Sequence, residues 1–226
     1  MTAHRSGFRT AAKAAVLMVA MLLGVPAAGA ADVAEGIDYR VLEHPAPVGK
    51  GGPGVEVAEW FWYGCPHCYR FDPELSAWAE RMGDQIHLVR LPALARPTWQ
   101  PMAAAFLMAR HTDRLGDLHS GFFEAVHEGG RSPYQLQWVR ARFEEAGVSG
   151  EQWREGIRAS WIREEVRRIR KLERAHQLQS VPTLVIAGRY VTNSRIAGSR
   201  ERMLEVAGVL VRRLGKEANG EGGSQE

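Results

Sequence analysis

The chain has 226 residues, with 29 Lys and Arg against 26 Asp and Glu, which gives a formal net charge of +3 at neutral pH. Three of the basic residues and none of the acidic ones lie within the first 30 residues, so the rest of the chain is electrically balanced. A nucleic-acid-binding protein is expected to carry a basic excess, and this balance therefore argues against nucleic acid as a partner. The length suits one domain with its own hydrophobic core.

The first 30 residues have the pattern of a secretory signal peptide. Three basic residues precede an apolar run over residues 14–25, and small residues follow, ending in Ala28-Gly29-Ala30. The apolar run is shorter than the ~20 residues that a membrane-spanning helix needs. The pattern predicts cleavage after Ala30 and export to an oxidising compartment, with a retained membrane anchor as the alternative.

Residues 55–63 are rich in β-branched and aromatic residues and predict a buried strand that leads directly to Gly64 and Cys65. Residues 69–82 have apolar positions at helical spacing and end at Gly83, which is expected to cap the helix. Residues 86–91 predict a second strand, ended by Pro92. The predicted order is strand, cysteine turn, helix, strand.

Residues 96–179 predict helices alone, with breaks at Gly116, Gly129-Gly130 and Gly147. Two helix starts are expected in this block. Ser132-Pro133 would supply the N-cap and first position of one helix, and Ser149 with Gln152 would form the capping box of another.

After this block, residues 181–186 and 190–192 predict an antiparallel pair of strands turned at Gly188-Arg189. Ser199 is expected to cap a final amphipathic helix, and the polar residues 216–226 are expected to form a disordered tail. The predicted fold is therefore an α/β unit split by an all-helical insertion.

The two cysteines, Cys65 and Cys68, are separated by only two residues, so a structural disulfide between them would constrain little of the unfolded chain. Redox chemistry or metal binding explains the pair better. A zinc site would need further cysteine or histidine ligands, but His111, His119 and His127 lie eight residues apart. Haem attachment would need histidine directly after Cys68. We expect no metal and no cofactor.

Placement of Cys65 between a strand and the start of a helix directs backbone N–H groups and the helix dipole at its sulfur, which favours the thiolate. His67 can add a hydrogen bond or a positive charge. Cys65 is therefore expected to attack and be attacked, whereas Cys68, one turn into the helix, would resolve the mixed disulfide. Stabilising the reduced form in this way makes the disulfide a better oxidant.

Two further sites are candidates. Glu59 lies six residues before Cys65 in an apolar strand. If buried, it could exchange a proton with Cys68; alternatively, it faces solvent on an edge strand or pairs with a basic residue. Val181-Pro182 begins a later strand, where a cis peptide bond would turn the backbone toward a neighbouring active site, although the local sequence does not establish that isomer.

Taken together, Glu59, the motif Cys65-Pro66-His67-Cys68, the helical block and Val181-Pro182-Thr183 resemble the DsbA family of periplasmic disulfide oxidoreductases. The resemblance implies a thioredoxin fold in which residues 31–95 and 180–215 form one discontinuous domain and residues 96–179 are inserted. It also implies a cis bond at Val181-Pro182 facing the cysteines, where both residues would contact substrate, and a buried acid at Glu59.

The same resemblance implies that the chain oxidises cysteine pairs of newly exported proteins in the periplasm, and that a quinone-linked membrane partner of the DsbB type reoxidises it. A monomer is favoured. The sequence departs from the family at Gly64, where a bulkier residue is frequent.

Other functions are weighed against this one. A disulfide reductase or isomerase could share the fold, but residues 31–64 are too few for the dimerisation domain of dimeric isomerases. A glutathione-using relative would not need Cys68, and a peptide-binding chaperone would not need Cys65. The charged run 163–174 suggests phosphate or membrane binding, but helical ion pairs explain it better.

Overall fold

A computed structural model describes residues 32–49 and 51–221. The predicted signal peptide, residues 1–30, lies outside this part of the chain. Five strands form one mixed sheet in the order β1-β5-β4-β2-β3. The strands are β1 (Arg40–Val41), β2 (Val55–Phe61), β3 (Ile86–Pro92), β4 (Thr183–Ile186) and β5 (Tyr190–Asn193). β2 pairs in parallel with β3, and the remaining pairs are antiparallel.

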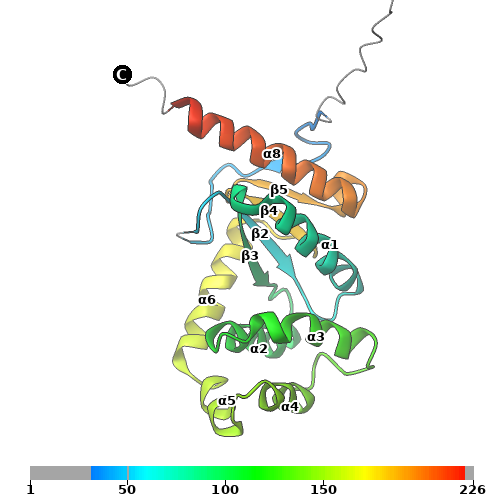
Figure 1. Cartoon of the computed structure of the whole chain (residues 1–226), viewed down its shortest axis with the longest axis vertical. Helices are drawn as coiled ribbons and strands as arrows, with labels where there is room; N and C mark the ends of the chain where they lie inside the picture. Colours follow the sequence, from blue (N-terminus) through cyan, green and yellow to red (C-terminus); the bar gives the residue numbers. More distant parts are fainter. Residues whose placement is uncertain (1–31, 50, 222–226) are drawn as a thin grey trace, which may run out of the picture.

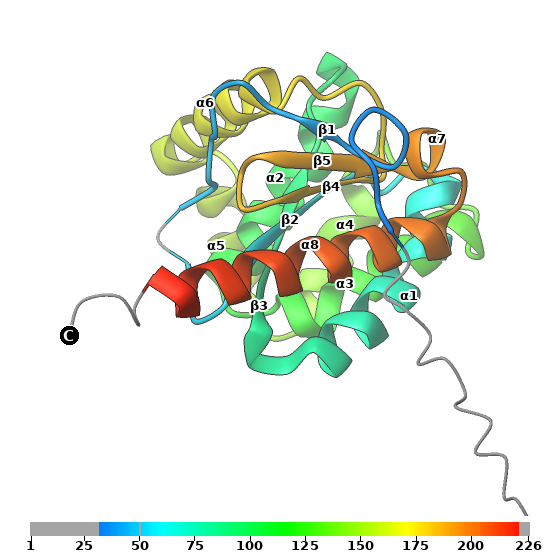
Figure 2. The same cartoon turned by 90° about the horizontal axis from the view of Figure 1, so that it is seen from above.

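Helices lie on both faces of this sheet and extend beyond one end of it (Figures 1 and 2). They are α1 (Pro66–Met82), α2 (Gln100–His111), α3 (Leu115–His127), α4 (Gln137–Glu145), α5 (Gly150–Gly156), α6 (Ser160–Ala175), α7 (Ser194–Ala197) and α8 (Arg200–Glu221), with short 3-10 turns at Gly83–Gln85 and Pro97–Trp99. This arrangement confirms the predicted α/β class and the thioredoxin fold with a helical insertion.

The alternation of side chains along β2 divides the core into two parts. Val57 packs with α1 and α8 on one face of the sheet, whereas Ala58 and Trp60 pack with the inserted helices on the other. Because successive strand residues point to opposite faces, Glu59 is directed to the face that α1 covers. The sheet register therefore places this carboxyl beneath the helix that contains Cys68.

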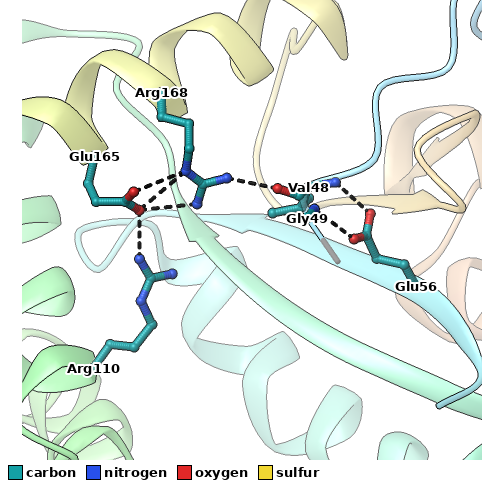
Figure 3. A network of polar contacts seen from close by, with 6 residues as sticks. All are labelled: Val48, Gly49, Glu56, Arg110, Glu165 and Arg168. Atoms are coloured by element: carbon teal, nitrogen blue, oxygen red, sulfur yellow. Dashed lines mark hydrogen bonds and ion pairs between the residues drawn. The ribbon is translucent and has the colours of Figure 1, made fainter. Parts of the chain in front are cut away.

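Polar contacts attach the inserted helices to the start of the sheet (Figure 3). On α6, Arg168 donates hydrogen bonds to Glu165 and to the carbonyl oxygen of Val48. Arg110 of α2 also donates to Glu165. The amide of Val48 in turn donates to Glu56 of β2. These contacts join α2, α6 and β2 through the segment before β2.

Most predicted helix and strand ends agree with the structure. Gly83 has φ +52° and follows the last residue of α1, as expected of a C-terminal cap. Ser149 and Gln152 form the predicted capping box. Ser199 accepts a hydrogen bond from the amide of Arg202 at the start of α8, and β4 and β5 form the predicted antiparallel pair.

Three predictions are wrong in detail. Ser132-Pro133 begins no helix: the Ser132 hydroxyl accepts from the amide of Tyr134 in a turn, and α4 begins later, at Gln137. Gly116 lies inside α3 instead of before it. The expected disordered tail is helical over residues 216–221, because α8 continues to Glu221; residues 222–226 lie outside the described part.

Candidate active site

The cysteine turn joins the end of β2 to the first residue of α1. Cys65 is the N-cap of this helix, with extended backbone angles, and Pro66 is at its first turn. Proline is accommodated there because the first helical residues need no N–H for an intrahelical bond. The amide of Cys65 donates to the carbonyl oxygen of Trp62, and its own carbonyl accepts from the amide of Tyr69. The backbone therefore fixes the position of the first sulfur.

The two sulfurs, both free thiols, have opposite environments. Cys65 is half-buried, and its pKa is lowered to about 6 by a hydrogen bond from the Cys68 thiol, by the amides of Cys68 and His67, and by the charge of His67. Cys68 is fully buried. Burial, its bond to Cys65 and the nearby Glu59 raise its pKa well above the ordinary value. The reduced site thus holds a thiolate at Cys65 and a thiol at Cys68 near neutral pH.

His67 lies on the exposed first turn of α1, between the two cysteines in sequence. Its Nδ1 atom is 3.2 Å from the guanidinium of Arg70. Since a guanidinium can only donate, this histidine nitrogen accepts the hydrogen bond. The backbone amide of His67 acts on Cys65 in either state of the ring, whereas the ring adds a positive charge only when it is protonated and no longer accepts from Arg70.

The Val181-Pro182 peptide bond is cis in the structure. Pro182 is buried, and the carbonyl oxygen of Val181 lies 3.7 Å from the Sγ atom of Cys65. Residues separated by more than a hundred positions in sequence thus meet at one sulfur.

Glu59 is buried in a central strand, so the alternative that it faces solvent on an edge strand is wrong. The alternative that it pairs with a basic residue holds: its Oε2 atom lies 3.2 Å from the Nε atom of Arg90 on β3. Burial nevertheless dominates and raises the pKa of Glu59 to about 7, although the charge of Arg90 opposes this shift. A carboxyl with such a pKa can both give and take a proton near neutral pH.

Arg90 also contacts α1, through hydrogen bonds to Asp72 at 3.0 Å and to the hydroxyl of Ser76 at 2.8 Å. The Nε2 atom of His119, on α3, lies 3.2 Å from the same oxygen of Asp72. β2, β3, α1 and α3 therefore each contribute a charged or titratable side chain to one cluster behind Cys68.

Gly64 has a steric reason to be glycine in this chain. A Cβ atom at this position would lie 2.4 Å from the ring of Trp62. That ring stacks on Trp99 with centroids 4.2 Å apart and an interplanar angle of 6°. The indole of Trp62 thus takes the space that a bulkier residue at Gly64 would occupy.

Sequence analysis did not identify Arg90, Asp72, His119 or Trp99 as parts of the site. Arg90 carried a usable signal, because a lone charge inside an apolar strand needs a buried partner. His119 was considered only as a zinc ligand. Its contact with Asp72 depends on the packing of α3 against α1, which periodicity does not fix.

Comparisons with known proteins agree with this geometry. A family model described as thioredoxin matches residues 44–205. The thiol:disulfide interchange protein DsbA of Pseudomonas aeruginosa is 34% identical over 197 residues, covering 87% of this chain and 92% of the relative. The chain belongs to the DsbA family. It is thus a thiol:disulfide oxidoreductase by descent.

Other relatives extend the likeness. The DsbA of Burkholderia cepacia is 28% identical over 88% of this chain and 94% of its own length. Among solved structures, DsbA of Pseudomonas aeruginosa has a TM-score of 0.76 at 32% identity, covering 83% of this chain and 97% of the other. DsbA of Xylella fastidiosa has a TM-score of 0.75 at 27% identity, covering 80% and 97%. The likeness thus includes the inserted helices.

Proposed function

We propose that this chain oxidises cysteine pairs of newly exported proteins by transferring to them a disulfide between Cys65 and Cys68. The observation that carries the proposal is the position of Cys65 at the N-cap of α1, where the thiol and amide of Cys68 and the amide of His67 favour its thiolate and lower its pKa. A low pKa at Cys65 stabilises the reduced site relative to the disulfide, which raises the reduction potential of the pair. The first cysteine of the reductase thioredoxin has a pKa of about 7, so the lower pKa of Cys65 favours an oxidant.

The reaction proceeds through two sulfur exchanges. A substrate thiolate attacks Sγ of Cys65, the bond between Cys65 and Cys68 breaks, and its electron pair leaves on Cys68. The buried Cys68 thiolate takes a proton from the carboxyl of Glu59. The second substrate thiolate then attacks the substrate sulfur of the mixed disulfide and expels Cys65 as a thiolate. The substrate loses two electrons, and the enzyme gains them as its dithiol.

The environments of Cys65 and Cys68 favour this order of the two exchange steps. Attack on Cys65 is favoured because it is the more exposed of the two sulfurs. Its low pKa also makes it the better leaving group in the second exchange. Val181 and Pro182 supply the adjoining substrate-binding backbone, where the Val181 carbonyl can accept a hydrogen bond from an extended substrate.

To act again, the dithiol needs an external oxidant. We assign this role to a quinone-linked membrane protein of the DsbB type, which would accept the two electrons through its own disulfide. The site of action is the periplasm, reached through the predicted signal peptide and its cleavage after Ala30. Within residues 32–49 and 51–221, no helix is both long and apolar enough to cross a membrane.

The test is an equilibrium of the chain lacking residues 1–30 with graded glutathione redox buffers, followed by thiol trapping. A reduction potential well above the approximately −270 mV of thioredoxin is expected. A potential near the thioredoxin value would assign the chain as a reductase. Absence of a reversible disulfide would reject the redox function, and Cys65→Ser serves as the control that cannot form it.

A second assay separates an oxidant from a peptide-binding chaperone. A reduced, unfolded protein with two cysteines is mixed with the oxidised chain, and disulfide formation is followed by mass spectrometry after alkylation. We expect stoichiometric oxidation by the unchanged chain and none by Cys65→Ser. A chaperone would bind the unfolded protein equally well with either variant.

A further inference from the structure

The cluster behind Cys68 contains a histidine that the sulfur exchanges do not use. His119 lies on α3 and is 7% exposed. Its Nε2 atom faces Asp72 at 3.2 Å, and its Nδ1 atom lies 2.8 Å from the hydroxyl of Tyr63. The imidazole therefore connects α1 to the segment that presents Cys65.

The protonation states of His119 and Asp72 determine which ring nitrogen of His119 has the proton. Burial lowers the pKa of His119, so the ring is neutral near pH 7. Burial raises the pKa of Asp72, but its contacts with His119 and Arg90 outweigh burial and lower that pKa overall, so the group is a carboxylate that can only accept. The proton of the ring is consequently on Nε2, directed at Asp72, and Nδ1 accepts from the hydroxyl of Tyr63. Nδ1 thus has a hydrogen-bond partner, whereas Nε2 faces Asp72 at ion-pair distance without a hydrogen bond of normal geometry.

His119 and Arg90 share one oxygen of Asp72. The Arg90 Nη2 atom lies 3.0 Å from Asp72 Oδ1, and its Nε atom lies 3.2 Å from Glu59 Oε2. The guanidinium is thus held between two carboxyl groups. Because the His119 Nε2–H group also faces Asp72, that carboxylate attracts Arg90 less strongly. The guanidinium can then interact more strongly with Glu59.

The cluster also reaches solvent away from Cys65. A cleft of about 310 Å³ between α1 and α3 is lined by Asp72, Ser76, Arg90, Leu115, Gly116, His119 and Ser120. In the proposed function, a substrate covers Cys65 while Glu59 gives its proton to Cys68. The cleft leaves the far side of the cluster open for exchange with water during that step.

We propose that His119 is a positioning residue for the redox reaction, which by its hydrogen bond with Tyr63 and its close contact with Asp72 fixes Arg90 against Glu59 at the open side of the cluster. This inference rests on the proposed function for its role in turnover, whereas the placement of Arg90 is independent of it. The groups that face Glu59 and His119 are Tyr63, Cys68, Asp72 and Arg90, and all belong to the same cluster.

The direct test is the titration of Glu59, followed by NMR of ¹³C-labelled glutamate carboxyl carbons and assigned with Glu59→Gln. In His119→Leu, Asp72 retains Arg90 as its charged donor and draws it away from Glu59. The midpoint of the Glu59 titration is then expected to rise by about half a pH unit or more. The pH profile of disulfide exchange with a dithiol peptide should move in the same direction.

Conservative variants separate this role from simple packing. His119→Gln keeps an N–H donor within reach of Asp72 and should titrate like the unchanged chain. His119→Asn is polar but too short to reach Asp72, so it should raise the midpoint of the Glu59 titration as His119→Leu does. If His119→Leu does not fold, His119→Asn provides the test. His111→Leu is the matched control, because His111 stacks on Trp161, with ring centroids 4.3 Å apart, outside the cluster.

Three outcomes would overturn the inference. The midpoint could stay in place in both His119→Leu and His119→Asn, His119→Gln could shift it as far as His119→Leu does, or His111→Leu could shift it equally. The proposed function fails separately, through the glutathione equilibrium of the unchanged chain. A chain without a reversible disulfide could still show the Glu59 shift, so the two failures are distinguishable.

Discussion

The Sγ atom of Cys65 lies 3.7 Å from the carbonyl oxygen of Val181, although the two residues are 116 positions apart in sequence. A thiol at Cys65 can donate to this oxygen, but a thiolate cannot. The negative charge at Cys65 is instead stabilised from the helix side, by the thiol and amide of Cys68 and by the amide of His67. The Val181 carbonyl therefore contributes no hydrogen bond to the thiolate form of Cys65.

This asymmetry predicts the titration of the reduced site. Absorbance at 240 nm, which reports thiolate, should rise with a midpoint near pH 6 in the unchanged reduced chain. The largest cause of the low pKa is the hydrogen bond from Cys68, so Cys68→Ala should move the midpoint upward toward the ordinary thiol value. Cys65→Ser should show no transition below pH 8. A midpoint unchanged by Cys68→Ala would refute the assigned cause.

The same thiolate links stability of the reduced form to pH. The folded pKa of Cys65 is depressed to about 6, below its ordinary value of 9.0, so unfolded chains bind more protons between these values. The contribution of Cys65 to stability should thus be complete above pH 9 and disappear as pH falls through 6. Its size is about 1.4 kcal/mol per pH unit in the window. Denaturant unfolding of reduced chain and Cys65→Ala at pH 5, 7 and 9 measures the difference.

Much of the fold could be predicted because local signals and the tertiary structure agree. The apolar run of β2 is buried on both faces, the Ser149 capping box forms within four residues, and Gly83 ends α1 with a positive φ. The cysteine turn is equally local, since its N-cap position depends on the residues next to it. Such features require no knowledge of distant partners.

The unpredicted features depend on long-range packing. Arg90 was assigned only to a strand, and the parallel register that places it opposite Glu59 is not encoded locally. The contacts of His119 need the inserted helix α3 to pack against α1. Ser132-Pro133 has the sequence of a helix start but forms a turn, because Ser132 bonds two residues ahead instead of capping a helix.

Burial of Glu59 predicts an opposite dependence of stability on pH. Its folded pKa is raised to about 7 from its ordinary value of 4.5. The proton it retains stabilises the fold fully below pH 4.5, and this contribution is lost as pH rises through 7. Relative to Glu59→Gln, the unchanged chain should lose at most about 3 kcal/mol across this range. Unfolding of both oxidised chains at pH 5 and 8 tests this, and parallel stability curves would contradict it.

Gly64 provides a steric prediction next to the reactive sulfur. In Gly64→Ala the new methyl group would lie 2.4 Å from the Trp62 ring, and this ring cannot move without breaking its stack on Trp99. We expect a loss of about 1–3 kcal/mol in the unfolding free energy of the oxidised chain, together with changed tryptophan emission.

Gly116→Ala is the matched control for Gly64→Ala. A Cβ atom at Gly116 would meet no atom within 4 Å, and the residue lies inside α3. Alanine should stabilise that helix by up to about 1 kcal/mol because it loses less backbone entropy than glycine on folding. Equal stability of the two variants would mean that Trp62 can leave its position beside Cys65 at no cost. The stack of Trp62 on Trp99 would then not fix the position of the indole.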